Sequence, residues 1–157
     1  PQSPRLRRRN DVMEYVVVFA AGTSIGTDIV VTQKDVRQIQ LAKGALAVAA
    51  RTLLKQLGLE TPDKILLAGA FGMYIDKYNA LTIGMIPDCP PDRIFAVGNS
   101  AGDGARIALL NVEKRREAQE VAARVTRYEL PDDPEFQEQF IRSMNFPPRG
   151  NASGGSQ

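Results

Sequence analysis

The feature that most restricts the fold of this chain is a pattern that occurs twice. A short apolar run is followed by a glycine-rich turn and then by a helical pattern, once over residues 64–72 and again over residues 93–104. A short apolar run that ends in glycines is typical of a buried strand, and repeated strand–helix units indicate parallel strands. We therefore expect an α/β domain whose mainly parallel or mixed sheet is flanked by helices.

Capping signals bound the other elements. Strand-like runs cover residues 14–19 and 28–31, and Thr32-x-x-Asp35 resembles a capping box at the start of a long helix. Gly58 stands where a C-cap glycine is expected. Residues 41–50 are apolar or small almost throughout, which suggests a helix buried on more than one side. The remaining expected elements are a short helix over 76–84, helices over 101–110 and 112–125, a last strand over 126–130 and a last helix over 132–143.

The chain divides into three expected segments. Its 157 residues have the size of one domain. Residues 1–13 are basic and begin without methionine, so we expect a loop that continues from a missing upstream chain. Residues 14–146 are expected to form the folded domain, and residues 147–157 have the composition of a disordered tail.

Composition excludes several classes of function. The chain has no histidine, which rules out a Ser-His-Asp triad, a Cys-His pair and a His-ligated metal. Its one cysteine, Cys89, cannot form an intramolecular disulfide or hold an iron–sulfur cluster alone, so we expect a cytoplasmic protein. A net charge of +2 is too small to indicate a nucleic-acid-binding surface by itself. No apolar run approaches the ~18 residues of a membrane span.

The glycine-rich turns carry the candidate chemistry. A glycine at the carboxyl end of a strand lets a ligand approach the backbone, and the N–H groups of a following helix favour an anion such as phosphate. The candidate nucleotide-binding residues are Gly69, Ala70, Phe71, Gly72, Gly98, Asn99, Gly102 and Asp103. Neither turn has Walker A or dinucleotide-binding spacing, so the alternative is that both serve packing only.

No catalytic residue is assigned, and no set of residues predicts a direct metal site. Asp103 lies inside a glycine run and could hold Mg²⁺ through water.

Several blocks, in this order, resemble the carboxyl-terminal region of the reductive activators of corrinoid proteins, which are ferredoxin-containing ATPases. The resemblance extends from Pro4 to Phe146 and is carried by residues 28–36 (DIVVTQKDV), 40–43 (QLAK), 67–72 (LAGAFG) and 97–105 (VGNSAGDGA).

The resemblance implies one half of an actin-like ATPase fold, a ribonuclease-H-like lobe of the acetate and sugar kinase, heat-shock chaperone and actin superfamily. Residues 66–70 would then be the adenosine motif, with Ala70 in place of its usual second glycine. Residues 98–105 would be a connecting helix whose small residues permit rotation of the lobe. The phosphate-binding hairpins of the superfamily would lie upstream.

The resemblance also implies an activity, the ATP-driven reduction of a corrinoid from Co(II) to Co(I). The expected partner is a corrinoid iron–sulfur protein or a corrinoid methyl-transfer protein, and we expect a homodimer. ATP with Mg²⁺ would bind weakly to this lobe, the [2Fe-2S] cluster would belong only to a missing upstream domain, and the fragment alone would be inactive. The alternatives are a non-catalytic interaction or dimerisation module, and the activase lobe for a radical dehydratase.

Overall fold

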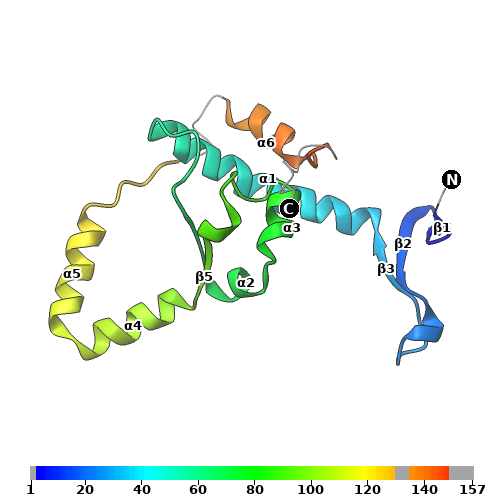
Figure 1. The fold of residues 1–157 in the computed structure, drawn as a ribbon, viewed down its shortest axis with the longest axis horizontal. Coiled ribbons are helices and arrows are strands. Elements are labelled where there is room, and N and C mark those ends of the chain that lie inside the picture. Colours follow the sequence, from blue (N-terminus) through cyan, green and yellow to red (C-terminus); the bar gives the residue numbers. More distant parts are fainter. Residues whose placement is uncertain (1–2, 130–134, 149–157) are drawn as a thin grey trace, which may run out of the picture.

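The computed structural model describes residues 3–129 and 135–148 of the chain. One long helix, α1 (Gln33–Gln56), connects the amino-terminal strands to the rest of the chain. A three-stranded sheet lies at the amino-terminal end of α1, and helix α6 (Phe136–Met144) runs along the other half (Figure 1).

The amino-terminal sheet is antiparallel, in the order β1 (Leu6–Arg9), β2 (Val12–Val18), β3 (Ile29–Thr32). Its register pairs Tyr15 of β2 with Leu6 on one side and Val31 on the other. Side chains alternate along β2, so that Val16 is 0% exposed while Tyr15 is 43% exposed. One face of this sheet is therefore apolar and open.

Residues 6–9 form a strand where the sequence predicts a basic loop. Two arginines at this end of the chain, Arg5 and Arg7, have partners on β2 and in the loop before β3. Arg7 forms ion pairs with Glu14 at 2.8 Å and with Asp28 at 2.7 Å. Arg5 donates hydrogen bonds to the carbonyl oxygens of Val16 and Val17, at 2.9 and 2.7 Å. Arg5 and Arg7 are thus held against the sheet, whereas Arg8 and Arg9 remain exposed.

Helix α1 begins and ends as its sequence predicts. The Thr32 hydroxyl accepts a hydrogen bond from the Asp35 backbone N–H, and the Asp35 carboxylate accepts one from the Thr32 N–H. Gly58, just past the helix, has φ +67°. The expectation that its middle is buried on more than one side is wrong: Val48 is 0% exposed, but Leu46 is 49% exposed. In the described part of the chain, the middle of α1 is covered on the face toward α6.

The second sheet pairs β4 (Ile65–Ala68) with β5 (Ile94–Gly98) in parallel. Between these strands lie α2 (Gly69–Tyr74), α3 (Lys77–Thr82) and the 3₁₀ turn η2 (Pro91–Arg93). After β5 come α4 (Ser100–Leu110) and α5 (Val112–Ala123). The expected mixed α/β fold is confirmed, with its antiparallel and parallel strands divided between two sheets.

One expected element is missing. Residues 126–129 contain no strand, and residue 130 lies outside the described part of the chain. Instead, Tyr128 accepts a hydrogen bond from the Gln56 amide at 3.0 Å, and Arg127 pairs with Glu129. A strand needs a neighbouring strand edge, and none is paired with this segment. The last helix begins at Phe136, and residues 132–134 of its expected range are not described.

The buried apolar core of the described residues is small and divided. It consists of Val16, Ala47, Val48, Ala80, Cys89 and Ile94. Helices α4 and α5 project away from the other elements (Figure 1), and Leu109 and Leu110 of α4 are 74% and 79% exposed. None of the helices among the described residues is long and apolar enough to cross a membrane.

Candidate functional site

Two of the predicted glycines meet at the carboxyl end of the parallel sheet, which we call the glycine edge. Gly69 directly follows β4, Gly98 is the last residue of β5, and Ala68 is the cross-strand partner of Gly98. Both glycines are in the left-handed region, with φ +83° at Gly69 and +70° at Gly98. The carboxyl ends of adjacent parallel strands are where open α/β sheets bind ligands.

The space around these two glycines is open. A Cβ placed on Gly69 would meet no heavy atom within 4 Å, and one on Gly98 would meet only the Met73 sulfur at 3.8 Å. Packing among the described residues therefore does not require a glycine at position 69. Its backbone conformation does, and the absence of a side chain leaves room for a ligand to reach the main chain.

Gly72 and Gly102 have a different reason to be glycine. A Cβ on Gly72 would lie 2.9 Å from the carbonyl carbon of Leu67, where α2 packs on β4. A Cβ on Gly102 would lie 2.5 Å from the amide nitrogen of Asn99. Contacts within the chain thus account for both residues.

The amino terminus of α4 is capped by the chain itself. The Asn99 side-chain oxygen accepts a hydrogen bond from the Gly102 N–H at 3.1 Å, and Asp103 pairs with Arg106 at 3.4 Å. This end of the helix therefore already holds one acceptor and one carboxylate. A phosphate would have to displace the Asn99 side chain and approach the Asp103 charge, so the structure does not favour the predicted phosphate contact here.

Exposed apolar side chains lie on α2, the helix that begins at the glycine edge. Helix α2 places Ala70 and Phe71 directly after Gly69, and Phe71 is 67% exposed. Met73 and Tyr74 on the same helix are 51% and 84% exposed. Glycine backbone beside exposed apolar and aromatic groups can hold a flat, largely apolar ring such as a nucleobase.

The described residues offer no metal centre. No group of three or more His, Cys, Asp or Glu side chains among them is arranged to hold an ion. Asp103 is engaged with Arg106, and Cys89 is buried alone. The residues present therefore do not fit a Mg²⁺ ion held by protein ligands alone, or a [2Fe-2S] cluster, which needs four ligands.

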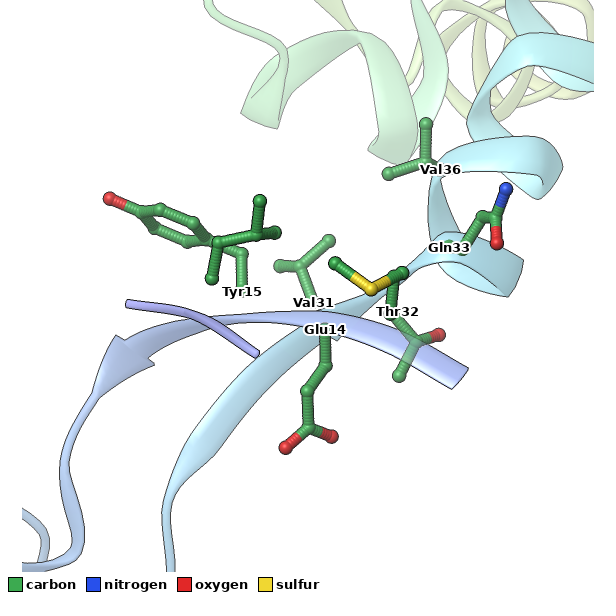
Figure 2. Close-up of a pocket in the computed structure, with 8 residues that line it drawn as sticks. Glu14, Tyr15, Val31, Thr32, Gln33 and Val36 are labelled. Carbon is green, nitrogen blue, oxygen red and sulfur yellow. The ribbon is translucent and has the colours of Figure 1, made fainter. Parts of the chain in front are cut away.

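Two cavities of about 300 Å³ lie away from the glycine edge. The first lies between the open face of the amino-terminal sheet and the start of α1. Figure 2 shows Tyr15 and Val31 on that face and Val36 on the helix, while the Glu14 carboxylate points to the opposite side of the sheet. The nearly continuous apolar run over residues 15–18 of β2 is the sequence signal, because alternate residues of a strand lie on opposite faces and such a run makes both faces apolar.

The second cavity lies between α1 and the end of α6. It is lined by Arg37, Gln40, Leu41, Met144 and Asn145. No local pattern in the sequence indicates it, because its two walls are far apart along the chain.

Comparison with known proteins gives one family match. A family model described as the C-terminal domain of RACo, the ASKHA domain, matches residues 1–153. A solved structure of a reductive activator for corrinoid, iron–sulfur protein is similar, with a TM-score of 0.79 and 34% sequence identity. That similarity covers 91% of this chain and 23% of the solved chain.

Two curated relatives are also similar. The corrinoid activation enzyme RamQ of Eubacterium limosum is 37% identical over 139 residues, which are 87% of this chain and 23% of RamQ. A [Co(II) methylated amine-specific corrinoid protein] reductase of Methanosarcina barkeri is 30% identical over 104 residues, 65% of this chain and 19% of that protein. The chain thus spans about a quarter of the length of these relatives, or less.

Proposed function

The chain belongs to the family of RACo C-terminal ASKHA domains, and from this premise we propose that it is the nucleotide-binding lobe of an ATP-dependent reductive activator. The activator would reduce the corrinoid of a methyl-transfer protein from Co(II) to Co(I). The names of the similar proteins, a corrinoid activation enzyme and a corrinoid protein reductase, support this activity.

One structural observation carries the proposal for this lobe. Gly69 and Gly98 lie at neighbouring strand ends with positive φ, and the space beside Gly69 is open. We assign the nucleoside part of ATP to this edge, with Gly69, Ala70 and Gly98 supplying backbone and Phe71 an apolar flank. Gly72, Asn99 and Gly102 support the edge through the packing of α2 and the cap of α4.

The other chemistry is assigned outside these residues. The phosphates and Mg²⁺ would be held by another lobe, because Asn99 already caps α4 and Asp103 already pairs with Arg106. One cysteine does not fit a [2Fe-2S] cluster, so this lobe supplies no electron. Its part is to bind the nucleoside and to couple that binding to the position of its helices.

The partner follows from the same proposal. A corrinoid iron–sulfur protein or another corrinoid methyl-transfer protein would dock on the complete activator, which we propose to be a cytoplasmic homodimer. Light scattering of the full-length activator would test the dimer. A monodisperse monomer at micromolar concentration would contradict it.

Nuclear magnetic resonance of the 157-residue chain, titrated with Mg-ATP, tests the nucleoside site. We expect the shifted amide signals to come from residues 69–73 and 98–99. Gly69→Asn should lower the affinity by about tenfold or more, because asparagine tolerates the left-handed backbone but fills the open space.

Gly26→Asn is the matched control. Gly26 has φ +65°, a Cβ added to it would meet nothing within 4 Å, and it lies in the loop between β2 and β3. This variant should bind ATP like the parent chain. Unaltered binding in a folded Gly69→Asn variant, or shifts confined to other segments, would contradict the proposed site and favour an interaction module.

A further inference from the structure

A buried lysine joins the carboxyl-terminal segment to α1. Lys43 is 2% exposed, and its ammonium group donates a hydrogen bond to the backbone carbonyl of Asn145. The same ammonium lies 5.4 Å from the centre of the Phe146 ring. We call residues 145–147, which follow α6, the C-terminal strap. Lys43 thus contacts two successive residues of the strap.

The strap then reaches a glycine turn that follows α3. A Cβ on Gly84 would lie 3.2 Å from Cγ of Pro147 and 3.8 Å from the Lys43 nitrogen. Gly84 also has φ +67°. The turn, the strap and the lysine therefore lie together, and a side chain on Gly84 would press against Pro147.

This point is the middle of the segment that joins the two glycines of the candidate site. Residues 69–98 leave the sheet at Gly69 and return through β5 to Gly98, and we call them the excursion. The Lys77 ammonium donates to the Pro91 carbonyl at 2.7 Å, which ties the two legs of the excursion together. The strap ties its midpoint to α1, because it lies on both Gly84 and Lys43.

We propose that the C-terminal strap is a conformational latch that restrains the excursion against α1, and that Lys43 holds the strap in place. The partners of Lys43 are a neutral carbonyl and an aromatic face, and no carboxylate pairs with it among residues 3–129 and 135–148. Closing the strap removes the ammonium from water, and this desolvation cost opposes the hydrogen bond and the cation–π contact.

The balance between these terms makes the latch reversible. Opening the strap returns the ammonium to water and releases Gly84, so the excursion gains freedom at its midpoint. If the glycine edge binds a nucleoside as proposed above, the strap also sets how rigidly that edge is held. This last consequence rests on the proposed function, whereas the latch itself does not.

Hydrogen exchange on the chain without nucleotide tests the latch. Gly84→Ala should speed exchange of the amides in α3 and in the strap by about tenfold or more relative to Gly58→Ala. Gly58 is the matched control, because it has the same φ of +67° but nothing within 4 Å of the added Cβ. Both variants carry the same backbone strain, so the difference between them measures the contact with the strap.

Lys43→Met is the second variant, since methionine keeps an unbranched apolar stem but has no ammonium. It should loosen the strap and α3 together while the amides of β2 keep their protection. Faster exchange in the strap alone would overturn the coupling to the excursion, and equal behaviour of Gly84→Ala and Gly58→Ala would overturn the latch. If Lys43→Met fails to fold, the comparison of Gly84→Ala with Gly58→Ala still tests the latch. Because no nucleotide is present, the outcome is independent of whether ATP binds.

Discussion

At the scale of single residues, Asp28 is one of the two carboxylates that pair with Arg7 in the amino-terminal sheet. Asp28 accepts a hydrogen bond from the Ala20 backbone N–H at 2.6 Å and pairs with Arg7 at 2.7 Å. The Ala20 hydrogen bond, followed by the Arg7 hydrogen bond, holds the pKa of Asp28 below its ordinary value of 3.8. Asp28 thereby fastens the loop after β2 to an arginine of β1.

Replacing Asp28 should alter how stability depends on pH. Because its folded-state pKa is lowered, the stability it contributes is fully present above pH 3.8 and is lost as the pH falls through the folded-state value. Asp28→Asn should therefore lower Tm at pH 7 and flatten the fall in Tm on acidification. Thermal unfolding followed by circular dichroism from pH 7 to about pH 2 checks this.

Asp11→Asn serves as the comparison for that experiment. The Asp11 side chain is 95% exposed, and its contact with Arg8 is long, at 3.6 Å. Its pH profile should follow that of the parent chain. If the profiles of Tm against pH are parallel for Asp28→Asn and the parent chain, the Asp28 contacts do not contribute to the pH dependence of stability.

At the scale of elements, the two glycines inside α4 have opposite roles. Gly102 leaves room for the Asn99 cap, whereas a Cβ on Gly104 would meet nothing within 4 Å. Glycine in a helix interior is less stable than alanine by about 0.5–1 kcal/mol unless its missing side chain is needed. The two positions therefore separate helix propensity from the geometry of the cap.

Two alanine substitutions should change stability in opposite directions. Gly104→Ala should stabilise the chain by about 0.5–1 kcal/mol, because it adds helix propensity without a clash. Gly102→Ala should destabilise it by about 0.5–2 kcal/mol, the range for losing an N-cap, because the added Cβ displaces the Asn99 amide. Urea unfolding of both variants measures the difference, and equal stabilisation by both would mean that the Asn99 cap is unimportant.

At the scale of the whole molecule, much apolar surface is left uncovered. The exposed side chains include Leu109 and Leu110 on α4, Val121 on α5 and Tyr15 and Val17 on β2. Exposed apolar surface over whole elements indicates contact with other protein surface. This agrees with the proposal that the chain is one lobe of a larger ATPase, since its similar relatives are several times longer.

The isolated chain should bind ATP weakly. The proposed nucleoside surface lies among the described residues, but the α4 terminus is already capped and no group of three or more metal-ligating side chains is formed among them. Charge-assisted hydrogen bonds to phosphate, each worth about 1.5–3 kcal/mol, are therefore missing. By calorimetry we expect a Kd of about 1 mM, which corresponds to a binding free energy of about −4 kcal/mol. Sub-micromolar binding by residues 1–157 would contradict the assignment of the phosphates to another lobe.

Local features were determined by the sequence alone. Three such features are the capping box of Thr32 and Asp35, the positive φ at Gly58, and the strands that end just before Gly69 and at Gly98. Such features depend on hydrogen bonds a few positions apart and on the freedom of glycine, so a short window of sequence suffices. The resemblance to the corrinoid activators also came from short blocks of this kind, and the family match confirms it.

Tertiary structure decided which residues meet across long separations. The burial of Lys43 depends on a strap about a hundred positions later, and the arginines of β1 find partners on β2 and in the following loop. Residues 126–129 have a strand-like composition but no strand edge to pair with. Pairing and burial depend on what the rest of the chain places alongside a segment, and local propensity contains no information about that neighbour.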